Sequence, residues 1–291
     1  NLFEGRQMVA AARKYDRVVQ HGTQNRSSPN IVEGIAKLKE GVIGHIYQVR
    51  GIDYKIRNNL GRINPAPVPP GLNWDRWLGP APQRPYSQFW HRRWYWLLEL
   101  SSGCFANQAV HELDIMRWGR GLDQLPTEIH SVGGKYVHDD DRTSPTHVVT
   151  TFRFGDADPL VTYEHRSWYT NSEAGFRDRY PFVQANFPVG TIFLGTEGYM
   201  IFPDYSCYFT FLGPQGETGP SEAAEGHPMM DLPHFQNWIA AVRDRDRSLL
   251  SAEINEGRFS TAVCLLARTS YQVGRPLRFD PQTERVLDDP Q

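Results

Sequence analysis

Three polar side chains lie close together in the sequence, at a spacing that could support proton transfer. Asn107, His111 and Asp114 lie at positions i, i+4 and i+7, so a helix through residues 103–119 places all three on one face. Histidine changes charge near neutral pH, which suits a positioned acid or base. The row could therefore move a proton. An ordinary amphipathic helix with one buried, hydrogen-bonded histidine explains the same spacing.

The stretch resembles the active-site helix in the second domain of the Gfo/Idh/MocA oxidoreductases. The family pattern is Asp-x-Gly-x-His-x-x-Asp, and the histidine falls on His111 and the last aspartate on Asp114. Asn107 replaces the leading aspartate, and Ala109 replaces the glycine. An amide takes no proton at neutral pH. The resemblance therefore implies that His111 contacts the reacting hydroxyl, Asn107 orients the substrate or His111, and Asp114 holds the tautomer of the imidazole.

The resemblance continues along most of the chain. Stretches similar to the family's elements follow in the family's order at 4–15, 17–26, 37–46, 234–242, 254–260 and 277–285. It implies an α+β fold, in which a large, mostly antiparallel open sheet carries helices on one face. The last helix and strand of a Rossmann-type domain would precede that sheet. We expect residues 1–27 to be the remnant of the dinucleotide-binding domain and residues 28–291 to form the substrate-binding and oligomerisation domain.

Two features that such an oxidoreductase needs are absent from the sequence. No G-x-G-x-x-G opens a βα unit, and no Glu-Lys-Pro segment supplies the family's catalytic lysine. A phosphate cradle needs glycines for close backbone approach and a helix N-terminus for the charge. We therefore expect NAD or NADP in the intact parent protein and no cofactor bound by this chain alone.

Polar residues elsewhere are candidates for the active cleft. By the resemblance, Gln24 and Asn25 would face the cofactor and Arg26 the substrate, because they follow a strand that points at the cleft; a plain helix-entry turn is the alternative. Arg93 and Trp94 precede the His111 helix, like an aromatic and basic segment that lies below the substrate in the family. At least one of these two is expected to bind substrate.

Two strand ends supply the remaining substrate-binding candidates. Tyr54 and Lys55 end a predicted strand and could meet a sugar hydroxyl, although a solvated strand end explains them as well. Of His165 and Arg166 on a central strand, alternation sends only one inward. The acidic run 138–141 is interpreted as a solvated loop, because consecutive residues cannot all converge on one cation. No metal site is expected.

Composition narrows the class of protein. With 40% hydrophobic residues, 22% charged residues and a net charge of -2, the chain is typical of a globular protein with no basic field, so nucleic acid is not an expected partner. No apolar run reaches 18 residues, which argues against a membrane span. Three cysteines fit a reducing compartment, and a cytoplasmic location is favoured. Export of the parent protein stays open, because its N-terminus is expected to be missing.

Periodicity predicts the elements that must position these side chains. Helices are expected at 2–15, 29–40, 231–242 and 254–273, and strands at 17–20, 45–55, 127–137, 146–154, 160–168, 190–194, 199–202 and 207–212. The helix at 231–242 should turn one face toward the core, made of Leu232, Phe235, Ile239 and Val242. Four prolines and four asparagines within 57–73 predict a long irregular loop.

The favoured function is the substrate domain of a nicotinamide-dependent oxidoreductase that acts on a sugar or cyclitol-like alcohol. A non-redox glycoside lyase or hydrolase of the same family is one alternative. A cofactor-free sugar-binding or scaffold protein is the other. Because the second face of the sheet has no helices of its own in such a fold, we also expect a homo-dimer or tetramer to form through it.

Overall fold

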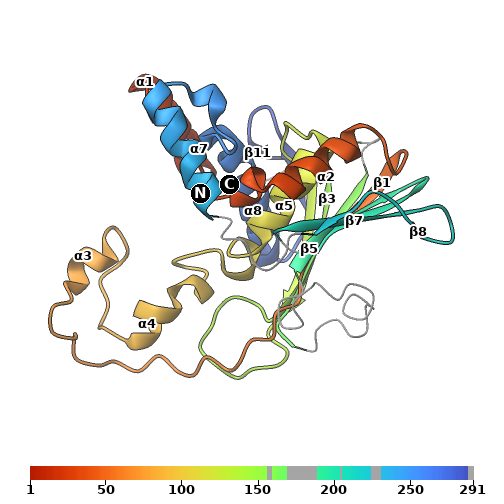
Figure 1. Cartoon of the computed structure of the whole chain (residues 1–291). Helices are drawn as coiled ribbons and strands as arrows, with labels where there is room; N and C mark the ends of the chain where they lie inside the picture. The colour runs from red at the N-terminus through yellow and green to blue at the C-terminus, as the bar shows by residue number, and fades with distance from the viewer. Residues whose placement is uncertain (156–158, 169–188, 204, 224–230, 288–291) are drawn as a thin grey trace.

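A large open sheet forms the centre of the computed structural model, which describes residues 1–155, 159–168, 189–203, 205–223 and 231–287 (Figure 1). Its strands are β1 (Ile46–Asp53), β2 (Glu128–Gly134), β3 (His147–Arg153), β4 (Leu160–Arg166), β5 (Val189–Gly195), β6 (Gly198–Phe202), β7 (Cys207–Leu212), β8 (Glu217–Thr218), β9 (Glu222–Ala223), β10 (Leu277–Asp280) and β11 (Arg285–Val286). The order is β11-β10-β2-β3-β4-β1-β5-β6-β7-β8, with β9 paired to β7.

All neighbouring pairs among these strands are antiparallel except β1 and β4, which run parallel. The prediction of a large, mostly antiparallel open sheet is therefore confirmed. Alternation explains why the strands were recognisable: Val148, Thr150 and Phe152 of β3 are buried, whereas Val149 between them is 47% exposed. The strand predicted at 17–20 does not form as a strand: its residue Gln20 makes a single isolated β-bridge to Glu253.

Helices cover one face of the sheet. The longer ones are α1 (Leu2–Lys14), α2 (Pro29–Lys39), α5 (Ala109–Arg120), α7 (Asp231–Asp244) and α8 (Ile254–Val273). Helices α2, α5 and α8 contact the sheet directly and enclose the main hydrophobic core, while α1 packs against α8 (Figure 1). In the described part of the chain, no helix combines the length and apolarity that a membrane crossing requires.

The predicted helix through residues 103–119 is interrupted. Residues Gly103–Phe105 form a short 3-10 turn, η3, and α5 starts only at Ala109, so Asn107 lies before the helix. Gly103 has a φ of +54°, and a Cβ on it would come within 2.2 Å of Ser144 Oγ. The chain needs a glycine there to turn past Ser144, whose Oγ accepts a hydrogen bond from the amide of Cys104 at 3.1 Å.

The predicted core face of α7 is wrong. Its apolar side chains are 41–59% exposed, namely Leu232, Phe235, Ile239 and Val242. The helix instead buries His234 and Ala241. The imidazole of His234 is hydrogen-bonded to Ser27 Oγ at 2.7 Å and to the backbone oxygen of His21 at 2.8 Å. These polar contacts, together with packing on η1 (Gln24–Ser27) and η4 (Arg247–Leu249), hold the opposite side of the helix against the body.

The irregular region predicted at 57–73 opens an arm that leaves the body, defined here as residues 57–95 (Figure 1). It carries α3 (Trp74–Leu78) and α4 (Gln88–Arg93). A small core of its own, built on Trp74, Leu78 and Tyr86, holds these helices together. The arm rejoins the body through η2 (Trp94–Trp96), which contacts η3.

Candidate active site

The C-terminal end of β1 and the start of α5 bring a set of polar side chains together. Helix α5 lies close to β1 because Gly51 has no side chain: an added Cβ would be 3.2 Å from Glu112 Cβ. Lys55 Nζ donates a hydrogen bond to Gln108 Oε1. Gln108 Nε2 donates to Glu112 Oε1 at 2.7 Å and to the hydroxyl of Tyr205. We call Lys55, Gln108, Glu112 and Tyr205, together with His111, the α5 cluster.

His111 joins the cluster through Tyr205. The two rings lie with their centroids 5.3 Å apart and are tilted by 48°. Among the described residues, His111 Nδ1 is buried without a hydrogen-bond partner. Burial lowers the pKa of His111 to about 4, with the positive charge of Lys55 acting in the same direction and Asp114 opposing it. At neutral pH the imidazole is therefore uncharged.

Buried ionisable groups lie behind the cluster. Asp53 Oδ2 and His165 Nδ1 are 2.9 Å apart, and both residues are fully buried. Burial raises the pKa of Glu112 well above its usual value, and the negative charge of Asp53 raises it further, which favours the protonated carboxyl. Burial lowers the pKa of Lys55, whereas the nearby Asp53 and Glu112 oppose that shift. The ammonium form of Lys55 is therefore less favoured here than in water.

Asp114 does not orient His111. Its carboxylate accepts hydrogen bonds from Arg26 Nε at 2.8 Å and Arg26 Nη2 at 2.9 Å, and from Ser260 Oγ at 2.6 Å. Arg26 is only 8% exposed and also contacts Glu256 at 3.3 Å. The predicted contact between Asp114 and His111 is wrong, and so is the role of Arg26 as a residue open to substrate. The pair instead ties η1 to α5 and α8.

The residues expected at the cofactor do not form a dinucleotide site by themselves. Gln24 Nε2 donates to Asp231 Oδ1 at 3.3 Å. Asn25 is 1% exposed, and its two side-chain polar atoms have no hydrogen-bond partner among the described residues. The described strands include one parallel pair, β1 and β4, and no glycine-rich turn joins a strand to a helix there. The described residues therefore do not fit the phosphates of a nicotinamide dinucleotide.

Tyr54 and Arg166 lie on the sheet face away from α5. The Tyr54 hydroxyl donates to Glu164 Oε2 at 2.6 Å, and Arg166 Nε donates to Glu164 Oε1 at 2.6 Å. Arg166 also stacks over the Tyr54 ring at 4.2 Å. His165 points inward and Arg166 outward, as alternation predicts. Lys55 is thus the one strand-end candidate of these three that reaches the α5 cluster.

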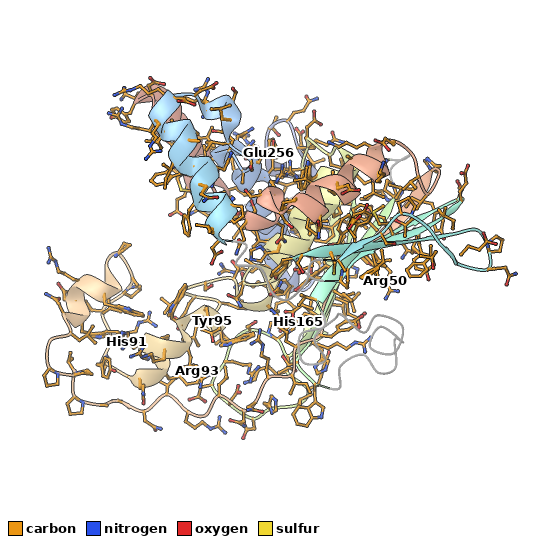
Figure 2. All side chains as sticks on the ribbon, in the orientation of Figure 1. Arg50, His91, Arg93, Tyr95, His165 and Glu256 are labelled. Atoms are coloured by element: carbon orange, nitrogen blue, oxygen red, sulfur yellow. The ribbon has the colours of Figure 1, made fainter. Side chains whose placement is uncertain are left out.

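Arg93 and Trp94 are placed on the arm. Both are exposed, and Figure 2 shows Arg93 on the arm, apart from His165 in the sheet. Asn107 is also exposed and comes immediately before Gln108. Its backbone N–H donates a hydrogen bond to the backbone oxygen of Gly103 at 2.9 Å. Of the predicted site residues, Lys55 and His111 meet in one cluster, and Asn107 borders it.

Sequence reasoning missed three members of the cluster. Gln108 and Glu112 repeat the i, i+4 spacing of Asn107 and His111 one position further along, which is a signal that could have found them. Tyr205 follows β6 and carries no local signal, because its approach to Gln108 depends on the whole sheet. The acidic run was also misread in part: Asp140 is fully buried, where it binds Arg142 at 2.7 Å. No group of three potential metal-binding side chains occurs in the described ranges.

Known proteins match this architecture. Residues 32–163 match the family model of the oxidoreductase family, C-terminal alpha/beta domain. No curated protein matches the chain. The WlbA dehydrogenase from Bordetella pertussis, solved with NADH and UDP-GlcNAcA, is 16% identical with a TM-score of 0.61, and the match covers 96% of this chain and 69% of that one.

Two further structures show how widely the fold is used. Levoglucosan dehydrogenase, solved with NADH and levoglucosan, is 14% identical with a TM-score of 0.63, covering 100% of this chain and 71% of that one. A super-repressor mutant of Gal80p from Saccharomyces cerevisiae is 11% identical with a TM-score of 0.63, covering 96% and 69%. At such identities the likeness concerns the fold. The family match itself concerns residues 32–163, which match the C-terminal α/β domain of the Gfo/Idh/MocA oxidoreductase family.

Proposed function

We propose that this chain supplies the substrate side of an oxidoreductase that acts on a hydroxyl group of a sugar or cyclitol-like alcohol. The observation that carries the proposal is an uncharged His111 in one cluster with Lys55, where the end of β1 meets the start of α5. The names of the similar structures support it, since WlbA and levoglucosan dehydrogenase were solved with NADH and a sugar-derived ligand. NAD or NADP would be bound by a nucleotide-binding domain. In this proposal residues 1–27 belong to that domain and residues 28–291 to the substrate domain.

In this proposal the side chains of the α5 cluster have different roles toward the reacting oxygen of the substrate. Oxidation of an alcohol carbon needs the hydroxyl proton to leave in step, so a base must contact that hydroxyl. The uncharged imidazole of His111 accepts the proton. The ammonium group of Lys55 stabilises the negative charge that develops on the oxygen, in a setting where water is largely excluded. Gln108 holds Lys55 in place, and the exposed amide of Asn107 is available to orient a substrate hydroxyl.

Lys55→Met tests this assignment in the protein joined to its nucleotide-binding domain. Sugars and cyclitols are screened with NAD and NADP by following nicotinamide absorbance. Loss of the cation should lower kcat by roughly 10²–10³, the usual worth of one preorganised electrostatic contact. Lys39→Met is the matched control, because Lys39 is exposed on α2 and does not belong to the α5 cluster. Equal turnover in the Lys55 variant and the control would contradict the proposal.

A second candidate is a cofactor-free sugar-binding protein. It is favoured by the absence of a phosphate cradle in the described residues and by the shared fold of the Gal80p super-repressor. Calorimetric titration with sugars separates the two candidates, because this candidate predicts sugar binding without any turnover. Product formation without net change in nicotinamide would instead indicate lyase or hydrolase chemistry.

We also propose that the chain forms a homo-dimer or tetramer through the sheet face opposite α5. Apolar side chains gather on that face over β5, β6 and β7: Ile192, Leu194, Tyr199, Ile201, Phe209 and Phe211. The three helices that contact the sheet lie on its other side. Ile192, Ile201 and Phe211 are already buried within the chain, so a second copy of the same face would cover the partly buried Leu194, Tyr199 and Phe209 in a self-complementary interface.

A further inference from the structure

A cavity lies in the arm, and none of its lining residues belongs to the α5 cluster. It has a volume of about 720 Å³ and opens between the loop 60–66 and helix α4. Three arginines line it together with apolar side chains: Arg62, Arg92, Arg93, Leu60, Pro65 and Phe89. None of the described residues that line it is acidic. A cavity of this size accommodates a small organic molecule.

One wall of this cavity is the loop 60–66. The acidic run 138–141, which the sequence predicts to be a solvated loop, holds this wall in place. Arg62 Nη1 donates to Asp141 Oδ1 at 2.9 Å, and Arg62 Nη2 donates to Asp139 Oδ2 at 2.5 Å. Asp141 Oδ2 also accepts from the amide of Ile63 at 2.7 Å. These bonds tether the loop and largely neutralise Arg62, so the positive charge of the cavity rests on the other two arginines.

The helical wall carries those two arginines and an apolar ring on two adjacent rows. Gln88 and Arg92 form one i, i+4 row of α4, and Phe89 and Arg93 form the next. Ser87 caps the helix by accepting a hydrogen bond from the amide of Phe89 at 3.2 Å. Neither Arg92 nor Arg93 has a hydrogen bond or ion pair with any described residue. Two neighbouring guanidinium groups thus face a preformed cavity with no counter-charge.

We propose that this cavity binds a small organic phosphate, with Arg92 and Arg93 on the phosphate oxygens and Phe89 and Leu60 against the organic part. Guanidinium groups present planar forks of donors that match phosphate oxygens, and each such bond is charge-assisted. An anion would also relieve the repulsion between the two adjacent cations. The site is separate from the α5 cluster, so it does not depend on the function proposed above.

Calorimetric titration of the chain at low ionic strength tests the proposal, with glucose 6-phosphate, inorganic phosphate, glucuronate and glucose as probes. Glucose 6-phosphate should bind saturably and more tightly than inorganic phosphate, because it adds apolar contact. Glucose should not compete at this site. Glucuronate binding as tightly as glucose 6-phosphate would overturn the assignment to phosphate. Absence of saturable binding by both phosphates would overturn the site itself.

Variants locate the binding. The double variant Arg92→Ala, Arg93→Ala should raise the Kd of glucose 6-phosphate by about tenfold or more, since charge-assisted hydrogen bonds are lost. Arg76→Ala is the matched control, because Arg76 is exposed on α3 of the same arm but does not line the cavity. Melting temperatures confirm that each variant folds. An unchanged Kd in the double variant, or an equal loss in the control, would show that the cavity is not the binding site.

Discussion

Replacement of Asp114 by asparagine should destabilise the fold, because the buried guanidinium of Arg26 would lose its carboxylate partner. Asp114 is fully buried and Arg26 is 8% exposed, and two hydrogen bonds of 2.8 and 2.9 Å join them. Removing one partner of such a pair typically costs about 3–5 kcal/mol, since the other charge stays buried and uncompensated. The remaining contact to Glu256 at 3.3 Å softens the loss. We therefore expect about 3 kcal/mol.

Thermal unfolding followed by circular dichroism measures this effect. For a chain of this size, about 3 kcal/mol corresponds to a fall in Tm of roughly 6–12 °C. Glu40→Gln is the control, because the pair of Glu40 with Lys37 is largely exposed and should be worth little. The double variant Arg26→Met, Asp114→Leu should recover part of the loss, since no unpaired charge remains. A shift no larger than that of the control would refute the reasoning that this pair holds η1 to α5.

Three further predictions concern protonation, packing and assembly. The imidazole of His111 should titrate near pH 4 by NMR, and because the unfolded state already takes up the proton near pH 6.5, the free energy of unfolding should fall by about 3 kcal/mol as pH falls from 6.5 to 4. Gly119→Ala should cost about 1–3 kcal/mol in chemical denaturation, because its Cβ would lie 2.6 Å from an aromatic ring, whereas Gly22→Ala, with nothing within 4 Å, should be neutral. Leu194→Asp on the sheet face opposite α5 should yield a monomer by light scattering, while Val32→Asp at an exposed position of α2 should leave the assembly unchanged.

Much of the sheet was predictable because its strands are periodic over their whole length. The expected strand at 207–212 coincides with β7, and the strand at 160–168 exceeds β4 by two residues. Helix α7 shows the limit of the same argument. Its apolar stripe predicts a helix correctly but does not say what the stripe faces, and in the described chain it faces outward.

The site was less predictable, because its contacts join residues far apart in sequence. A row of side chains at i, i+4 and i+7 pointed to His111, yet the turn at Gly103 removed Asn107 from the helix. Asp114 was spaced well for His111 but lies nearer to Arg26, which is 88 residues away along the chain. Tertiary packing decides which partner such a carboxylate meets, and local spacing carries no information about it.

The most direct test of the central claim is to measure turnover and Tm of His111→Asn on one preparation of the protein joined to its nucleotide-binding domain. The proposal predicts that kcat falls by roughly 10²–10⁴, the usual worth of a positioned base. It also predicts a nearly unchanged Tm, because His111 Nδ1 makes no hydrogen bond that the substitution would break. His45→Asn, an exposed histidine, serves as the control. A clear loss of Tm with near-normal turnover would contradict the assignment of His111 as the group that takes the substrate proton.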